Sequence, residues 1–238
     1  MVAVVSDIHG NLEAFESVIK DIKSNPEVTR IFCLGDMIDY GADSSAVVHK
    51  FDILAQDYSI NCVRGNHEEA VLTRDCSRFT TEHGRQNFEI TLKEIYSEDG
   101  LADKIKSMTS SYRLCILNYG AEGVCLVHGT ETDCYWGKHG RLSGSVTSLH
   151  DIDKRVVLCG HSHLQGWKFE EESNSILINP GSVGQPRNGD SRAQYLLCDN
   201  DFHDFYFKRV DYDVKTASQK IKDSGRPRFL YQRLLFGI

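Results

Sequence analysis

The sequence predicts an α/β protein, in part α+β, in which two mixed β-sheets pack face to face between outer helices as a four-layer αββα sandwich. Two observations lead to this expectation. Apolar strands alternate with helices in residues 2–66, whereas short strands separated by turns dominate residues 112–210. Two sheets in contact would bury both groups of strands. Because 238 residues can bury one large core, we expect a single domain over residues 1–238.

Strands and helices alternate in the first part of the chain. Asn11 is a candidate N-cap, and the apolar residues after it recur at the spacing of a helix. A second helix is predicted over about 43–57, which gives a βαβαβ order and therefore neighbouring strands joined by helical crossovers. The predicted strands are VAVV (2–5), RIFCLGD (30–36) and SINCVRGN (59–66).

The pattern changes after residues 68–108, which are expected to be mostly helical. This stretch and the later loop TETDCYWGKHGR are expected to shape a cleft. The runs YRLCILN and GVCLVHG are separated by YGAEG, which indicates a β-hairpin. A short amphipathic helix is expected over 214–221, before an apolar tail at 229–238. Further strands are predicted in RVVLCG, WKFEE, SILINPG, AQYLLCD and DFYFKRV.

Composition limits the function classes. The 27 Lys and Arg against 34 Asp and Glu give a net charge of −7, so no general affinity for nucleic acid or anionic membranes is expected. The N-terminal MVAVVSDIHG does not resemble a secretory signal, and no apolar run is long enough to span a membrane. The eight cysteines include no CxxC pair. The expected location is therefore the reducing cytoplasm.

Residues of the kinds that bind metals follow five of the predicted strands. Ligand sites in open α/β sheets lie at the carboxyl ends of strands, so one edge of the sheets would gather these side chains. The groups are, in chain order, Asp7 with His9, Asp36 with Asp39, Asn66 with His67 and Glu68, then His128, and finally His161 with His163.

Each group also has an ordinary structural explanation. Asp7 could cap the following helix, and Asp36 and Asp39 could be turn residues. Asn66 could occupy a left-handed turn position, and His128 could be a hydrogen-bonded core histidine. These explanations are independent of one another, and they do not account for every group falling at a strand end. The joint pattern therefore favours a metal site.

The ligand types indicate two divalent transition metals. Oxygen and imidazole ligands without thiolate suit manganese, iron, zinc, nickel or cobalt better than calcium, and we expect manganese first. Seven candidate side chains are too many for one tetrahedral zinc, but they suffice for two ions about 3.5–4 Å apart. Two ions so close need an anion between them, and Asp36 is the candidate.

The segments DIH, GDMID, GNHE, VHG and GHSH, in this order, resemble the signature segments of the calcineurin-like metallophosphoesterases. The later segment NPGSVGQPRNGDSRAQY is similar to a small prokaryotic branch of that family, the YfcE-like or diadenosine-tetraphosphatase-like proteins. The resemblance implies a two-sheet sandwich flanked by helices. The ligands that it implies are Asp7, His9 and His163 for the first metal, Asp36 as the bridge, and Asn66, His128 and His161 for the second metal.

The resemblance also implies roles for residues beside the metals. His67 would face the substrate without binding a metal, and Asp39 would hold its imidazole in place. A hydroxide bridging the metals would attack phosphorus, while His67 would stabilise charge or protonate the leaving oxygen. Asn66 is expected to contact the substrate as well as its metal. Arg64 and Arg187 could add phosphate contacts, with surface ion pairs as the alternative.

The implied function is the hydrolysis of phosphate mono- or diesters, with a small phosphate ester or nucleotide as substrate. A dinucleoside polyphosphate or a Ser/Thr phosphoprotein is the alternative. This chain has Tyr40 where the Ser/Thr phosphatase branch has Arg, although Arg64 in RGNHE matches that branch. A third hypothesis is a scaffold that only binds proteins, but the retromer subunit of the family lacks the histidine that this chain keeps at position 67. The oligomeric state, monomer or homodimer, stays open.

Overall fold

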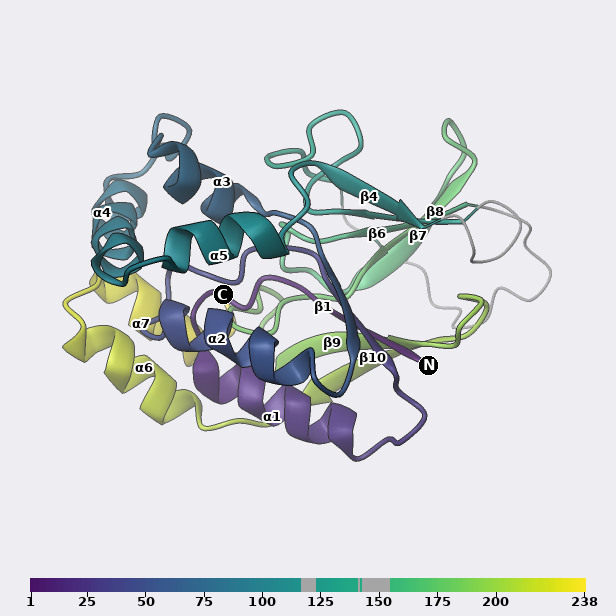
Figure 1. The fold of residues 1–238 in the computed structure, drawn as a ribbon, viewed down its shortest axis with the longest axis horizontal. Coiled ribbons are helices and arrows are strands. Elements are labelled where there is room, and N and C mark those ends of the chain that lie inside the picture. The colour runs from purple at the N-terminus through teal and green to yellow at the C-terminus, as the bar shows by residue number, and fades with distance from the viewer. Residues whose placement is uncertain (117–122, 141, 143–154) are drawn as a thin grey trace.

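Two mixed β-sheets pack face to face at the centre of the protein, and helices flank them (Figure 1). The computed structural model describes residues 1–116, 123–140, 142 and 155–238. Within these residues, each strand predicted from the sequence is present. The expected α/β sandwich of two mixed sheets flanked by helices is therefore confirmed.

The first sheet contains three parallel strands and two antiparallel neighbours. Its strands are β1 (Val2–Val5), β2 (Arg30–Cys33), β3 (Ser59–Cys62), β9 (Ala193–Cys198) and β10 (Phe205–Val210). The spatial order is β10-β9-β1-β2-β3. The strands β1, β2 and β3 are parallel, as the βαβαβ order predicted. β9 is antiparallel to β1, and β10 is antiparallel to β9.

The second sheet also has a parallel centre with antiparallel edges. Its strands are β4 (Arg113–Ile116), β5 (Val124–Val127), β6 (Arg155–Cys159), β7 (Gly166–Glu170) and β8 (Ser175–Asn179). The order is β4-β5-β6-β8-β7. β4 pairs with β5 antiparallel, so the predicted pairing of this hairpin is confirmed, while residues 119–122 of its turn lie outside the described residues.

The helices follow the sequence pattern closely. The expected N-cap is found, because the Asn11 side chain accepts a hydrogen bond from the Ala14 backbone N–H at 3.1 Å. The expected helical stretch 68–108 contains three helices, and the short amphipathic helix is α6. The helices are α1 (Leu12–Lys23), α2 (Ser44–Leu54), α3 (Asn66–Thr73), α4 (Glu82–Ser97), α5 (Leu101–Met108), α6 (Val214–Asp223) and α7 (Arg228–Leu234).

The apolar tail contains a helix that the sequence pattern had not indicated. α7 begins after Pro227, and it places Leu230 and Leu234 on one face, where both pack against Ile221 of α6. This spacing of four residues is that of an amphipathic helix. Tyr40, from the loop after β2, packs against the same cluster, so the C-terminal helices contact a loop that follows a central strand.

Successive side chains of β1 point alternately into two buried apolar layers. Val2 and Val4 point into the apolar layer between the two sheets, whereas Ala3 and Val5 point to the layer between the first sheet and its helices. This is the two-residue period of a strand that is buried on both faces. Phe32 of β2 is fully buried in the layer between the sheets.

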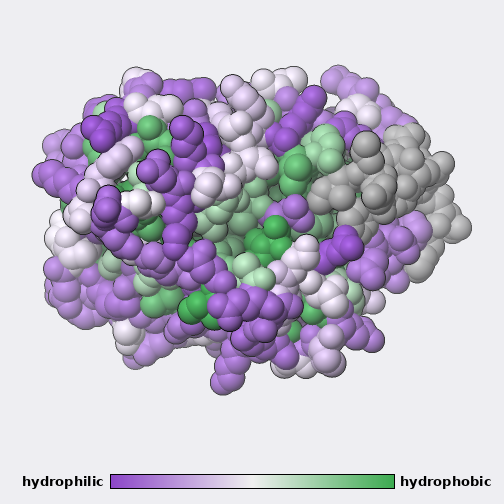
Figure 2. Space-filling view, in the orientation of Figure 1, coloured by the Kyte–Doolittle hydropathy of each residue, from purple (hydrophilic) through white to green (hydrophobic). Residues whose placement is uncertain are grey.

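The surface view in Figure 2 shows mostly hydrophilic residues at the periphery, with hydrophobic residues gathered towards the middle of this face. Across the part of the chain that is described, no helix combines the length and the apolar character that crossing a membrane requires.

We predict that Phe32→Ala destabilises the protein by about 3–5 kcal/mol, because it leaves a cavity between the two sheets. The matched control is Tyr206→Ala, which removes a side chain that is 50% exposed on β10 and should change stability little. Urea unfolding followed by circular dichroism measures both variants. Equal stability of the two variants would contradict the inter-sheet role of Phe32.

Candidate metal centre

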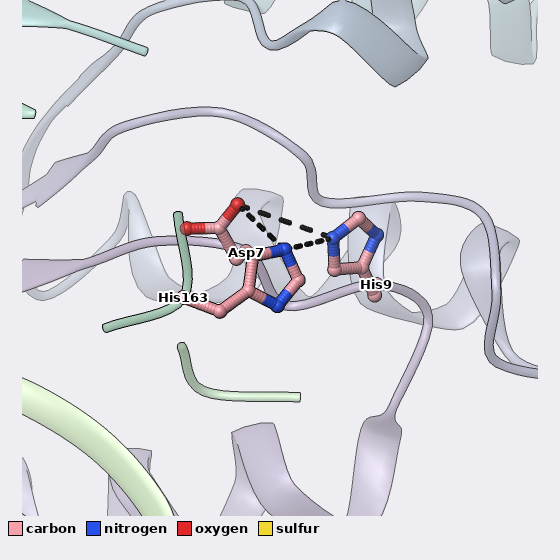
Figure 3. Close-up of side chains that lie close together, drawn as sticks. All are labelled: Asp7, His9 and His163. Atoms are coloured by element: carbon pink, nitrogen blue, oxygen red, sulfur yellow. Dashed lines mark hydrogen bonds and ion pairs between the residues drawn. The ribbon is translucent and has the colours of Figure 1, made fainter. Parts of the chain in front are cut away.

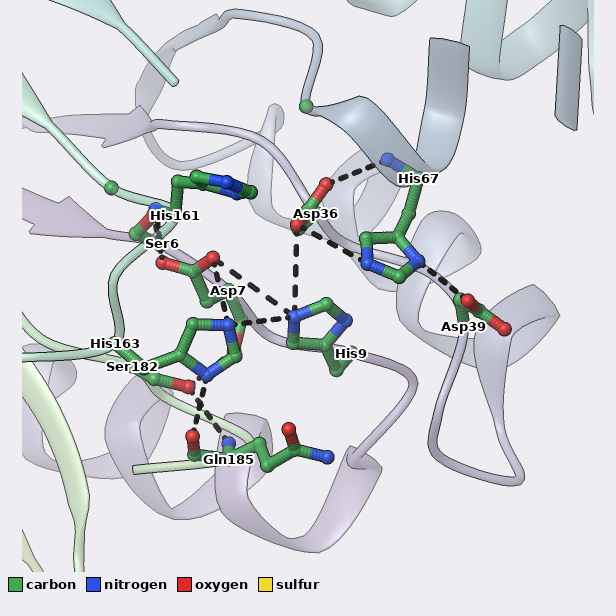
Figure 4. A network of polar contacts seen from close by, with 12 residues as sticks. Ser6, Asp7, His9, Asp36, Asp39, His67, His161, His163, Ser182 and Gln185 are labelled. Atoms are coloured by element: carbon green, nitrogen blue, oxygen red, sulfur yellow. Dashed lines mark hydrogen bonds and ion pairs between the residues drawn. The ribbon is translucent and has the colours of Figure 1, made fainter. Parts of the chain in front are cut away.

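Five segments meet at one edge of the two sheets, and Figure 4 shows side chains from the loops after β1, β2 and β6 and from the start of α3. Asp7 follows β1 and Asp36 follows β2, while Asn66 begins α3 after β3. His128 follows β5 and His161 follows β6 in the second sheet. All five side chains are buried. The structure thus brings together residues from both sheets that are distant in the sequence.

The backbone at this edge is left-handed at many residues that carry side chains. Asp and His tolerate this conformation better than most residues, but it still costs free energy that the surrounding structure must supply. Among the described residues ten non-glycine residues have positive φ, and seven of them lie here. The seven are Asp7, His9, Asp36, Asp39, Tyr40, His161 and His163.

The His-Ser-His segment after β6 places its two imidazoles in two different groups of side chains. His161 and His163 have φ of 63° and 60°, and the Ser162 backbone N–H between them donates to the Gly160 carbonyl at 2.7 Å. His161 faces Asp36 and His128, whereas His163 faces Asp7 and His9. The tight left-handed turn therefore lets neighbouring histidines serve separate positions.

The first group consists of Asp7, His9 and His163 (Figure 3). The His9 Nδ1 faces the Ile38 carbonyl at 3.2 Å, and the His163 Nδ1 faces the Gln185 carbonyl at 2.6 Å, so both rings carry their proton on Nδ1. Their Nε2 atoms, each with a lone pair, then lie 3.2 Å apart. The Asp7 Oδ1 is 3.3 Å from the His163 Nε2 and finds no hydrogen-bond partner in the described residues.

The second group consists of Asp36, His128 and His161, with Asn66 beside them. The His128 Nδ1 faces the Leu34 carbonyl at 2.7 Å. The His128 Nε2 faces the Asn66 Oδ1 at 3.0 Å and the Asp36 Oδ2 at 3.1 Å. The buried His161 Nε2 has no hydrogen-bond partner among the described residues.

These contacts fit bound cations. Two imidazole lone pairs and a carboxylate oxygen that face one another in a buried site repel, and a cation between them removes that repulsion. The Asp36 Oδ2 lies between the groups, 3.7 Å from the His9 Nε2 and 3.1 Å from the His128 Nε2. Carboxylate, amide and imidazole donors can hold divalent metals, so the two groups could hold one ion each.

Burial and nearby charges shift the pKa values of these groups, and for His9, His163 and Asp36 the shift favours the form that binds a metal. Burial holds the pKa of His9 and His163 well below the usual range, so both imidazoles are neutral. Burial alone would raise the pKa of Asp36, but the nearby imidazoles, His128 first, hold that pKa well below its usual value. Asp7 is shifted in the opposite direction, because burial raises its pKa to about 6 and so favours the protonated form.

His67 is held in a separate hydrogen-bonded chain. Its Nδ1 lies 2.5 Å from the Asp39 Oδ2, and the other Asp39 oxygen accepts hydrogen bonds from Asn87 and Thr91 of α4. The His67 Nε2 therefore points towards the two groups of candidate metal ligands, which we call the metal groups, and lies 3.8 Å from the Asp36 Oδ2. Burial by itself would lower the pKa of His67, but the Asp36 and Asp39 carboxylates raise it above its usual value.

The buried Glu68 carboxylate fixes the loop that carries Asp36. Its Oε2 accepts from the backbone N–H groups of Asp36 at 2.8 Å and Gly65 at 2.9 Å. Its Oε1 accepts from Met37 at 2.7 Å and Ile38 at 3.1 Å. A Cβ on Gly65 would lie 2.1 Å from the Asp36 Oδ1, so only glycine allows this close approach.

An open cavity of about 510 Å³ borders both groups, and Arg187 lines it. One Arg187 nitrogen donates to the Gln185 Oε1 at 2.8 Å, while its Nε has no partner in the described residues. Arg64 does not line this cavity. Its guanidinium pairs with Glu69 at 2.8 Å and donates to Thr109 at 3.2 Å. The structure brings Arg187 to the site, and it holds Arg64 in an ion pair elsewhere.

The family model for the calcineurin-like phosphoesterase superfamily domain matches residues 1–201. The chain belongs to the calcineurin-like phosphoesterase superfamily. The segments that resembled this superfamily are the segments that supply the buried Asp, Asn and His side chains of the site. The C-terminal helices α6 and α7 lie beyond the matched residues.

The chain is similar to individual proteins along most of its length. An uncharacterized protein from Methanocaldococcus jannaschii is 32% identical over 254 residues, covering 100% of this chain and 98% of that protein. A symmetrical bis(5′-nucleosyl)-tetraphosphatase from Pseudomonas putida is 27% identical over 187 residues, covering 77% of this chain and 59% of that protein. The crystal structure of a metallophosphoesterase from Sphaerobacter thermophilus is similar with a TM-score of 0.76 at 25% identity, covering 100% of this chain and 98% of that one.

The sequence pattern did not indicate several residues that the fold brings to the site. Asn87 and Thr91 contact Asp39, and their spacing of four residues on one helix was the signal available for them. Phe79 and Trp136 line the cavity. They lie in segments that were expected to shape a cleft, but no local pattern distinguished them from core residues.

We predict that Glu68→Gln destabilises the protein by about 2–4 kcal/mol, because the amide nitrogen would face two backbone N–H donors. The control is Glu69→Gln, whose side chain forms a partly exposed ion pair with Arg64, and the expected loss there is below about 1 kcal/mol. Denaturant unfolding measures both. A loss for Glu68→Gln no larger than for Glu69→Gln would show that the four amide contacts do not hold this loop.

Proposed function

We propose that this protein is a metal-dependent phosphoesterase that hydrolyses phosphate mono- or diesters at a dinuclear centre. The observation that carries the proposal is the meeting of two ligand groups at Asp36, with the His67–Asp39 pair beside them in an open cavity. Superfamily membership supports the same class of reaction. A small phosphate ester or nucleotide fits a cavity of this size. We propose that the protein is located in the cytoplasm.

The proposed ligand sets divide the buried donors between two cations. When bound, the two ions supply Lewis-acid charge that polarises the phosphoryl group and activates water for attack on phosphorus. Donors without thiolate suit manganese, with iron, zinc, nickel and cobalt as alternatives. The proposed ligands are Asp7, His9 and His163 for one ion, Asn66, His128 and His161 for the other, and Asp36 between them.

His67 is the proposed general acid. The Asp39 carboxylate faces its Nδ1, which favours the charged imidazolium and leaves a proton on Nε2. That nitrogen points towards the metal groups, where it can donate the proton to the leaving oxygen of the ester. Asn87 and Thr91 hold Asp39 in this position, and Asp39 in turn fixes the orientation of the His67 ring and of its Nε2 proton. A scaffold that only binds proteins would have no use for such a chain.

Arg187 is the proposed phosphate-binding residue. It lines the cavity, and within the described residues its guanidinium forms no ion pair with a carboxylate. A guanidinium without a carboxylate partner is free to bind phosphoryl oxygens with two parallel hydrogen bonds. Gln185 positions it by accepting one of its hydrogen bonds, and the Gln185 carbonyl contacts His163 in turn.

A second candidate function is the hydrolysis of dinucleoside polyphosphates. The similarity to the symmetrical bis(5′-nucleosyl)-tetraphosphatase favours it. A substrate panel discriminates the two: bis-p-nitrophenyl phosphate, p-nitrophenyl phosphate and diadenosine tetraphosphate, each assayed with manganese, iron, zinc, nickel and cobalt. Hydrolysis of the simple esters supports the first proposal, and a strong preference for the tetraphosphate supports the second. No turnover of any substrate with any metal would overturn both.

We predict that Asp36→Asn weakens manganese binding at one site or both by at least about a hundredfold and abolishes turnover. The reason is that a neutral amide no longer offsets the repulsion between two nearby cations. Calorimetric titration of the chelator-treated protein with manganese counts the sites and their affinities. The control Asp57→Asn, at an exposed carboxylate, should bind as the native protein does. Two intact sites with a normal rate would rule out the bridging role of Asp36.

We predict that His67→Ala keeps both metals but slows hydrolysis of alkyl phosphate esters by about a hundredfold or more. Aryl esters such as p-nitrophenyl phosphate should be slowed less, because their leaving groups need little proton donation. Rates on both ester types, with metal content measured in each sample, test this. An equal loss on the two esters would leave charge stabilisation as the role of His67, and no loss on either would remove it from the mechanism.

A further inference from the structure

Two aromatic side chains form one wall of the cavity beside the metal groups. Trp136 comes from the loop after β5, and Phe79 comes from the segment between α3 and α4. Their rings meet edge to face with centroids 5.4 Å apart, and both line the cavity. We refer to Trp136 and Phe79 as the aromatic wall.

The aromatic wall stands directly beside the residues that act on the phosphate. The Phe79 ring lies 5.1 Å from the His67 ring, and the Trp136 ring lies 6.3 Å from the His161 ring, between centroids. A phosphate ester bound at the metal groups would therefore extend its alcohol portion along this wall, because His67 is the proposed proton donor to the leaving oxygen.

The loop that carries Trp136 is held in one conformation by its own hydrogen bonds. The Trp136 backbone N–H donates to the Asp133 Oδ1 at 3.1 Å, and the Gly137 N–H donates to the Asp133 carbonyl at 3.0 Å. The Gly129 N–H, one residue after His128, donates to the Cys134 carbonyl at 2.7 Å. Trp136 is therefore positioned before a ligand arrives, which lowers the entropic cost of binding.

A planar cation already lies over the indole of Trp136. The Arg78 guanidinium carbon is 5.0 Å from the indole centroid, and the same guanidinium pairs with Asp133 at 3.3 Å. The Arg78 side chain is 57% exposed, so this ion pair is screened by water and is easily displaced. The indole face that stacks with Arg78 can equally stack with a flat ring of a ligand.

We propose that the aromatic wall recognises a planar ring on the alcohol side of the substrate, so that the phosphoesterase acts on phosphate esters of ring-bearing alcohols such as nucleosides. The inference rests on the proposed function and names the class of its substrate. Stacking of a base on an aromatic side chain contributes affinity whichever base is present, because every base has a flat π-face. The ring replaces Arg78 on the indole, and the phosphate occupies the metal groups.

The experiment compares adenosine 5′-monophosphate with ribose 5-phosphate, which carries a hydroxyl where the nucleotide carries the planar adenine base. Calorimetry on manganese-loaded protein should give an affinity at least about tenfold higher for the nucleotide. Trp136→Ala should remove this preference while leaving ribose 5-phosphate binding unchanged, and Trp136→Phe should keep part of it. Tyr135→Ala is the matched control, because Tyr135 is the neighbouring residue but stacks on Tyr112 away from the cavity, and it should keep the full preference.

Fluorescence gives an independent readout of the same contact. The chain has two tryptophans, and Trp167 packs against Phe205 rather than lining the cavity. In a Trp167→Phe background, adenosine 5′-monophosphate should quench the remaining fluorescence of Trp136, and ribose 5-phosphate should not.

The outcomes separate this inference from the function on which it rests. Equal affinity for the two ligands, or equal loss of both in Trp136→Ala, overturns the aromatic wall as a ring site. Hydrolysis of simple phosphate esters in the same preparation would then leave the phosphoesterase proposal standing. Absence of binding for both ligands together with absence of ester hydrolysis would overturn both.

Discussion

One buried carboxylate holds the loop on which the site depends. Glu68 accepts four backbone hydrogen bonds, three from the loop after β2 and one from Gly65 before α3. An ionised carboxylate buried in this way needs such donors, and the loop in turn needs acceptors for amides that no strand or helix satisfies. The contact fixes Asp36 relative to Asn66, and so it fixes the distance between two proposed ligands from different strands.

Most of the fold was predictable, because the spacing of apolar residues and the positions of turn residues identify strands and helices from local sequence. Runs of four apolar residues such as VAVV are short and buried on both faces, which is typical of central strands in an α/β sheet. The helix α7 was not predicted, since its apolar residues Leu230 and Leu234 are interleaved with other apolar residues that hide the period. The order of the strands within each sheet could not be predicted from the sequence either, because pairings such as β6 with β8 depend on contacts between distant segments.

The site was predictable where side-chain chemistry repeats at strand ends, and not where it depends on three-dimensional neighbours. Metal-binding residue types after five strands indicated the buried groups around Asp36. Arg64 was expected either to contact phosphate or to form an ion pair, and the sequence alone did not identify Glu69, five residues later, as the carboxylate that pairs with its guanidinium. Phe79 and Trp136 have no local signature, because they reach the cavity only when the segment after α3 and the loop after β5 fold against the site.

Each group of proposed ligands draws on both sheets. Asp7 and His9 come from the first sheet and His163 from the second, and the other group divides in the same way between Asp36 and His128. An ion bound to either group is therefore a cross-link between the halves of the sandwich. Because such an ion binds the folded chain and not the separated sheets, metal supply and resistance to unfolding become one coupled equilibrium. Loss of such an ion would then raise the unfolded fraction of this protein and, with it, the rate of its proteolysis.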